Sequence, residues 1–69
     1  MKLYFENKYG KRRIIAEPKN RDEAWEEIYK FCSDRYFNIY YTRTWIDSDG
    51  LEVYDVGSHS EFFYLDNKD

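Results

Sequence analysis

One helix-forming segment, near residues 21–35, divides a chain whose other apolar stretches alternate with polar residues as β-strands do. Asn20 and Glu23 stand before it with the spacing of a capping box, in which each side chain accepts a backbone N–H of the other residue. Beyond them, apolar side chains recur with helical spacing, at Trp25, Ile28, Tyr29, Cys32 and Tyr36. The sequence therefore predicts a single helix at 21–35 that buries this face.

The N-terminal segment has the pattern of a β-hairpin. Residues 3–7 and 12–17 are rich in aromatic or β-branched side chains, which favour strands. Gly10 lies between them and can adopt the positive φ that a tight turn needs. Pro18 ends the second strand because it has no N–H to donate to a ladder.

After the helix, residues 37–47 change to a period of two residues, which predicts a strand. Phe37, Ile39, Tyr41 and Trp45 would share one face of it. Asp47 to Gly50 has the composition of a turn, and residues 51–56 return as the partner strand.

The last strand is predicted at 61–65. Ser58 and Glu61 also have capping-box spacing, so a short helix at 59–66 is an alternative. The strand is favoured because Phe-Phe-Tyr has high β-propensity, and so short a helix is marginal on its own.

These elements give the order ββαβββ, an α+β fold in which one helix packs on a mostly antiparallel sheet. The 69 residues are expected to form one domain, with 66–69 as a polar tail that frays. A chain of this size buries only about 60% of its unfolded surface. With one cysteine it has no disulfide to support the fold, so its eight Tyr, five Phe and two Trp must supply the core.

The net charge of −3 argues against duplex nucleic acid as the main partner, because such binders carry a basic excess. No apolar run has the length of about 20 residues that crosses a bilayer. The N-terminus lacks the apolar core of a signal peptide, and the lone thiol suits a reducing compartment. We expect a cytoplasmic protein without a membrane partner.

Catalytic patterns in the sequence are weak. Ser58, His59 and Ser60 adjoin Asp55, but neighbouring residues of an extended chain point to opposite sides, which is poor geometry for a triad. This segment is interpreted as a polar turn. Cys32 lies on the apolar face of the helix, where a free cysteine acts as a small hydrophobe. One Cys and one His are too few for a zinc site, so we expect neither enzymatic activity nor a metal or cofactor.

The binding residues predicted for a protein partner lie in the strand at 37–47. Arg43 stands between Tyr41 and Trp45, where it can stack on the indole or pair with Asp55 on the neighbouring strand. One interpretation is an arginine whose stem packs and whose head reaches water. The other is a contact residue, because Arg, Tyr and Trp anchor interfaces. Tyr40, on the opposite face, completes the predicted set.

A basic hairpin end offers an alternative function in nucleic-acid binding. Single-strand binders place basic groups beside aromatic rings, and the hairpin has both. The candidate residues are Lys11, Arg12, Arg13, Tyr9 and Tyr4. Three charges beside a turn are equally an ordinary solvated hairpin end, and the acidic helix opposes their field.

The C-terminal half carries two strings that resemble a known group of proteins. They read Tyr41-x-Arg43-x-Trp45-x-Asp47-x-Asp49-Gly50 and Tyr54-Asp55-x-Gly57-Ser58-x-x-Glu61-Phe62-Phe63-Tyr64. Residues 24–65 resemble small uncharacterised proteins of phages and prophages of Gram-positive bacteria. The resemblance implies a phage or prophage accessory protein in the bacterial host, but it transfers no activity and no functional residue.

The sequence therefore predicts a non-enzymatic module that binds a protein. A second copy of the chain is one candidate partner, because an edge strand such as 3–7 can pair with another strand.

Overall fold

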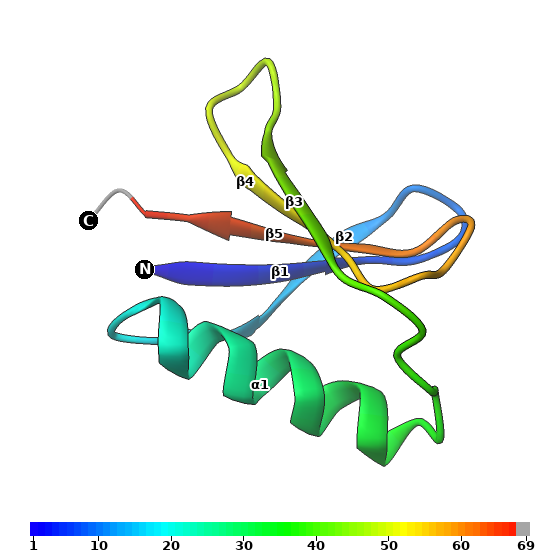
Figure 1. Ribbon diagram of the computed structural model, residues 1–69. Helices are drawn as coiled ribbons and strands as arrows, with labels where there is room; N and C mark the ends of the chain where they lie inside the picture. Colours follow the sequence, from blue (N-terminus) through cyan, green and yellow to red (C-terminus); the bar gives the residue numbers. More distant parts are fainter. Residues whose placement is uncertain (68–69) are drawn as a thin grey trace.

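The computed structural model describes residues 1–67, which form a five-stranded sheet with one helix across one of its faces (Figure 1). The elements in chain order are β1 (Lys2–Glu6), β2 (Arg12–Ala16), α1 (Arg21–Asp34), β3 (Arg43–Ile46), β4 (Glu52–Asp55) and β5 (Phe62–Asp66). The strands lie in the order β2-β1-β5-β4-β3, and all neighbours are antiparallel. The predicted α+β class is confirmed.

The helix begins where the sequence predicts. Asn20 is its N-cap, and the Asn20 side chain accepts a hydrogen bond from the Glu23 N–H at 2.9 Å. The return bond differs from a standard capping box, because the Glu23 carboxylate accepts from the N–H of Lys19 at 3.0 Å. Arg35 is the C-cap, so the helix is one residue shorter than predicted.

Replacing Asn20 with alanine is expected to lower the free energy of unfolding by about 1 kcal/mol, because an N-cap side chain satisfies an otherwise unpaired helix N–H. Chemical denaturation followed by circular dichroism measures the change. Asn38→Ala, at an exposed position after the helix, is the control and should change stability little. Equal losses in the two variants would contradict the capping role.

The buried face of α1 is rotated from the predicted one. Ala24, Ile28 and Cys32 are buried against the sheet, with Trp25 and Phe31 partly buried beside them. This face brings the small Ala24 side chain against the sheet and leaves the predicted core residue Tyr29 exposed.

Tyr36 is the second error in the predicted helix face. It is 95% exposed and has φ of +57°, so the chain has already left the helix. The N–H of Phe37 donates to the carbonyl of Cys32 at 2.9 Å and closes the helix end. A left-handed residue of this kind terminates many helices.

The core lies between α1 and the facing side of β1, β5 and β4. Leu3 pairs with Leu65, and Phe5 pairs with Phe63, so these four buried side chains form adjacent cross-strand pairs. Phe31 of the helix contacts Phe5 at 4.7 Å and Phe63 at 5.7 Å between ring centroids. Aromatic rings thus supply much of the contact between helix and sheet.

Four of the five predicted strands are correct to within one residue at each end, namely those at 3–7, 12–17, 51–56 and 61–65. The strand predicted at 37–47 is reduced to 43–46. Residues 37–42 instead link the helix to the far edge of the sheet (Figure 1). The common face predicted for Phe37, Ile39, Tyr41 and Trp45 is therefore wrong. Phe37 and Ile39 leave the two-residue period because they pack against the core.

The predicted tail at 66–69 is only partly described. Asp66 belongs to β5 and pairs with Lys2 across the sheet, so fraying is not found there. The Asn67 side chain donates to Glu52 at 3.0 Å. Residues 68–69 lie outside the described part of the chain.

Candidate interaction surface

The face of the sheet opposite α1 carries a row of apolar side chains that crosses all five strands. The strand register places Ile14, Tyr4, Tyr64, Val53 and Trp45 next to one another in that order. Val53 and Tyr64 are buried in the middle of the row, whereas Ile14 and Trp45 at its ends are 47% and 42% exposed. We call this side of the sheet the open face.

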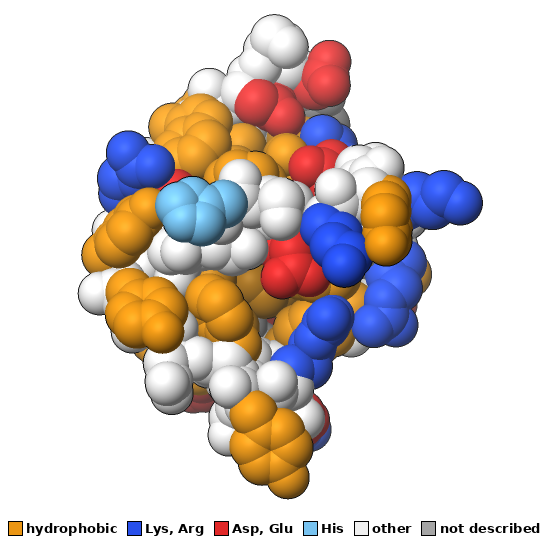
Figure 2. Space-filling view, turned by 90° about the vertical axis from the view of Figure 1, so that its right-hand side faces the viewer, with side chains coloured by type: hydrophobic (Ala, Val, Ile, Leu, Met, Phe, Trp, Pro, Cys, Tyr) orange, Lys and Arg blue, Asp and Glu red, His pale blue; other side chains and the backbone are white. Residues whose placement is uncertain are grey.

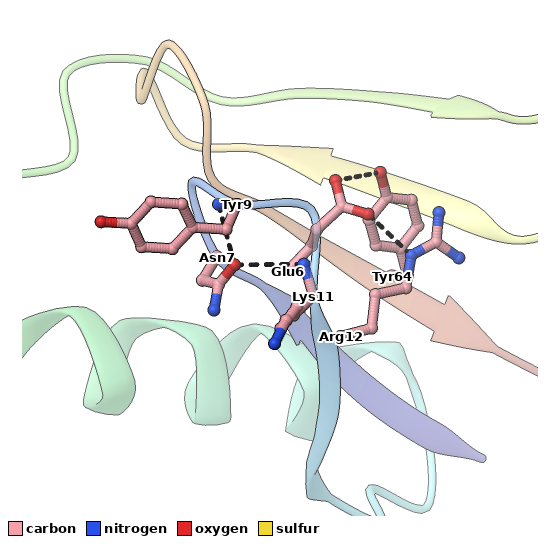
Figure 3. A network of polar contacts seen from close by, with 6 residues as sticks. All are labelled: Glu6, Asn7, Tyr9, Lys11, Arg12 and Tyr64. Atoms are coloured by element: carbon pink, nitrogen blue, oxygen red, sulfur yellow. Dashed lines mark hydrogen bonds and ion pairs between the residues drawn. The ribbon is translucent and has the colours of Figure 1, made fainter.

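Arg12 covers the middle of the open face on the β1–β2 side (Figure 3). Its Nε donates to Glu6 at 2.9 Å, and its guanidinium lies 3.7 Å from the centroid of the Tyr64 ring. The Tyr64 hydroxyl donates to the other oxygen of Glu6 at 3.1 Å. Burial, and then the charge of Glu6, raise the pKa of Tyr64. The charge of Arg12 is thus balanced within the fold.

Arg43 has the corresponding place on the β3–β4 side. Its Nη2 donates to Asp55 at 2.8 Å, which confirms the predicted pair, and this hydrogen bond raises the pKa of Arg43. Asp55 is buried and also accepts from the N–H of Gly57 at 2.9 Å. The Arg43 side chain is nevertheless 65% exposed. Its head is therefore fixed at one side and open to solvent at the other.

The aromatic neighbours of Arg43 form a cluster at the β3 edge. The guanidinium lies 5.4 Å from the Tyr41 ring centroid and 6.0 Å from that of Trp45. Trp45 in turn meets Phe62 edge to face at 6.3 Å. The structure therefore brings together three of the four residues predicted for a protein partner. We call Tyr41, Arg43 and Trp45 the β3 cluster.

Tyr40, the fourth predicted residue, is exposed but lies outside this cluster. Its ring packs against Phe37 at 6.3 Å, in the linking segment that precedes β3. Its Cβ also lies 3.2 Å from the place where a Cβ on Gly57 would be. Tyr40 therefore packs on the loop after β4.

Replacing Gly57 with alanine is expected to lower the free energy of unfolding by about 1–2 kcal/mol, because Gly57 has a left-handed φ of +97°. The close contact of the added Cβ with Tyr40 should increase this loss. Gly10→Ala is the control, because Gly10 has φ of +78° but nothing within 4 Å of an added Cβ. Denaturant titrations should show a larger loss for Gly57→Ala. A larger loss of stability for Gly10→Ala would mean that Tyr40 moves away from the added Cβ without destabilising the fold.

The predicted nucleic-acid residues are only partly brought together. Arg12 lies on the open face, while Arg13 lies on the helix side, 5.6 Å from the Phe31 ring, because successive strand residues alternate. Tyr4 belongs to the middle of the apolar row, away from the turn. Tyr9 and Lys11 remain in the turn, where both backbone N–H groups donate to the Asn7 side chain at 2.9 and 3.1 Å (Figure 3).

A groove at the hairpin end nevertheless collects the three basic residues predicted for nucleic acid and two others. It has a volume of about 710 Å³ and is lined by Lys8, Lys11, Arg12, Arg13 and Arg35, together with Tyr9 and Glu61. Figure 2 faces this end of the molecule and shows Lys and Arg side chains gathered on one side of the view around an acidic side chain. Arg35 was absent from the predicted set, since it is distant in sequence and reaches the groove only through the fold.

The segment at 57–61 is a polar turn, as predicted. The Ser58 hydroxyl accepts from the N–H groups of Ser60 and Glu61 at 3.4 and 3.2 Å, and strand β5 follows instead of the alternative helix. His59 and Ser60 are exposed. Cys32 is buried in the helix face, and this burial raises the pKa of its thiol.

Glu52 forms a buried polar cluster that the sequence analysis missed. Its two oxygens accept from Arg21 at 2.8 and 2.7 Å, and one also accepts from the Tyr54 hydroxyl at 3.2 Å. The hydrogen bonds from Arg21 lower the pKa of Glu52. Arg21 begins the helix and Glu52 begins β4, so the cluster ties α1 to the sheet and has a structural role.

Among residues 1–67 there is no group of three or more His, Cys, Asp or Glu side chains that could hold a metal ion. Within the same range, α1 lacks the length and apolar character that a bilayer-crossing helix requires. Comparisons of the chain with protein-family models, with curated proteins and with solved structures found no match. The use of the open face must therefore be inferred from its own geometry.

Proposed function

We propose that the protein is a non-enzymatic module that binds a protein partner through the β3 cluster and the adjoining open face. The observation that supports this most is the geometry of Arg43 and Trp45. The guanidinium is held by buried Asp55 at 2.8 Å, yet it and the indole remain exposed side by side. Arg, Trp and Tyr are the residues that most often carry the binding energy of protein interfaces.

The charge of the open face favours a protein over a polyanion. Arg12 is paired with Glu6, and Arg43 is paired with Asp55, so its two arginines bring little net positive charge. Arg12 also stacks on the Tyr64 ring, and Arg43 lies beside the Trp45 ring, which limits their movement before a partner arrives. Fixing such side chains in advance reduces the entropy that binding must remove.

The resemblance of residues 24–65 to phage and prophage proteins supports a host protein as the partner. In that setting the module is an accessory protein that acts in the cytoplasm of a Gram-positive bacterium. A module that binds without chemistry can inhibit or redirect a host factor simply by covering its surface.

Affinity capture from a Gram-positive lysate tests the proposal. The immobilised protein, Trp45→Ala and Tyr9→Ala are compared, since Tyr9 is an even more exposed aromatic residue in the opposite hairpin. We expect proteins that are retained by the parent chain and by Tyr9→Ala at both low and high salt, but lost with Trp45→Ala. Retention that is indifferent to Trp45 would contradict the proposal.

Trp45 is a better probe than Arg43. Removal of Arg43 would leave the buried Asp55 carboxylate without its cation, which destabilises the fold as well as the surface. The indole of Trp45 is half-exposed at a sheet edge, so its removal should leave the fold intact. Circular dichroism of the variant checks this.

The basic groove supports a second candidate function, the binding of single-stranded nucleic acid. Five Lys or Arg side chains and the exposed Tyr9 ring line it. An oligonucleotide held there should dissociate steeply as salt rises, and the double variant Lys11→Ala, Arg13→Ala should abolish binding. Trp45→Ala should leave it unchanged. Binding that persists in the double variant would exclude the groove.

A further inference from the structure

We propose that the outer edge of β3 pairs antiparallel with β3 of a second copy, so that the two sheets continue into one. This inference rests on the proposed function, because it uses the same edge of the sheet, and it adds a second copy of the chain as a partner beside the proposed host protein. The sheet order leaves two edges, β2 and β3, and only one of them is suited to pairing. The strand predicted at 3–7 as an edge corresponds to β1, which lies inside the sheet between β2 and β5.

The β2 edge is protected against pairing. Arg12 and Arg13 follow Lys11 there, so a pairing centred on residues 11–13 would bring like charges together. The ladder between β1 and β2 is also irregular between Leu3 and Tyr4. Charged residues and ladder irregularities are the features by which proteins prevent edge-to-edge association.

The β3 edge lacks most of this protection. Its four residues are all exposed, and Trp45 and Ile46 are 42% and 63% exposed on opposite sides of the strand. Arg43 is its only charged residue, and that charge is already paired with Asp55. An exposed edge with these side chains is a template for a further strand.

The backbone groups of the β3 edge have the right orientation for a partner. The Asp47 N–H donates to the Leu51 carbonyl at 2.9 Å, so residue 47 directs its N–H toward β4. In an antiparallel ladder this direction alternates, so Trp45 and Arg43 also direct their backbone groups toward β4. The N–H and carbonyl groups of Thr44 and Ile46 therefore point outward, where a second strand would meet them.

A pairing centred on Trp45 uses the whole strand. Thr44 and Ile46 exchange hydrogen bonds with Ile46 and Thr44 of the second copy, and the two indoles face each other at the two-fold axis. Arg43 then lies opposite Asp47 of the second copy, and the same pair forms twice. Opposite charges directly across a ladder stabilise it. A pairing centred on Arg43 would instead oppose two like charges.

The chain offers a matched pair of variants for the test. Ile46→Lys places a charge on the β3 edge, and Ile14→Lys places the same charge at a comparably exposed position on the β2 edge. Light scattering across protein concentrations, at low and high salt, measures the mass. We expect the parent chain and Ile14→Lys to approach twice the monomer mass. Ile46→Lys should stay monomeric, with a dissociation constant raised at least tenfold.

Thr44→Pro provides an independent variant, because it removes an outward N–H and leaves the bonds to β4 in place; it too should be monomeric. A parent chain that stays monomeric up to millimolar concentration would overturn the inference. So would a dimer that survives Ile46→Lys but is lost in Ile14→Lys. If the chain is monomeric but lysate proteins are captured in a way that depends on Trp45, the proposed function stands and only the pairing of β3 is overturned. If the chain is monomeric and nothing is captured, the proposed function is overturned as well.

Discussion

Replacing Phe63 with alanine should lower the free energy of unfolding by about 3–5 kcal/mol, the range observed for buried Phe→Ala changes. Phe63 is buried and contacts Phe5 at 5.4 Å and Phe31 at 5.7 Å, so its removal opens a cavity where three elements meet. Domains have only about 0.05–0.15 kcal/mol of stability per residue. In a chain of 69 residues, such a loss should unfold a large part of the population.

Phe62→Ala is the matched control for this prediction. Phe62 is the preceding residue in β5 but points to the open face, where it is partly exposed and meets Trp45. Urea titrations followed by tryptophan fluorescence should show a much smaller loss for Phe62→Ala. Similar losses of stability in the two variants would mean that Phe63 and Phe62 do not lie on the buried and open faces of the sheet as described.

The free energy of unfolding should fall by about 2 kcal/mol as the pH rises from 10 to 12, because a tenfold difference between the folded and unfolded acid constants of one group is worth about 1.4 kcal/mol. The full loss of about 3 kcal/mol is reached only above pH 12. Burial, and then the charge of Glu52, raise the pKa of Tyr54 from 10 to about 12. Because the folded-state pKa is the higher one, the stabilisation is fully present below the unfolded value. It is lost as the pH rises through the folded value.

Tyr54→Phe isolates this effect. The variant loses the hydrogen bond to Glu52, but Arg21 and Asn67 still donate to that carboxylate, so the cost at neutral pH should be small. Its stability should decline less above pH 10 than that of the parent chain. Part of the decline should remain, because the pKa of Tyr64 is also raised. Identical alkaline profiles would show that Tyr54 is not the group responsible.

Local patterns predicted most of the fold. The capping asparagine, the turn glycines and the alternation within the four strands outside 37–47 depend on neighbouring residues, and these predictions agree with the structure in all but detail. Asn20 begins the helix as predicted, and Gly10 and Gly50 have positive φ in their hairpin turns. The face of α1 that is buried depends on which row of its side chains packs on the sheet, and that packing involves residues distant in sequence.

The largest error lies at 37–42, for a physical reason. The sequence there alternates like a strand, but α1 ends far from the β3 edge, and the chain must cross between them. Phe37 and Ile39 are drawn to the core on the way. Tertiary packing thus overrides a local sequence pattern that on its own predicts a strand.

The candidate surface could be predicted in part. The pair of Arg43 with Asp55 followed from two adjacent strands joined by a tight turn, which nearly fixes the register. The row across five strands could not be predicted, because it needs the sheet order. For the same reason, the interior position of the strand predicted at 3–7 was missed.

Residue-resolved amide spectra of the parent chain, recorded as its concentration rises from micromolar to millimolar, test the central claim most directly. That claim is that the β3 edge pairs with β3 of a second copy. We expect shifts at 41–47, with the Thr44 and Ile46 amides becoming protected from hydrogen exchange, while β2 and α1 stay unchanged. Shifts confined to the groove at 8–13, or no change at any concentration, would contradict it.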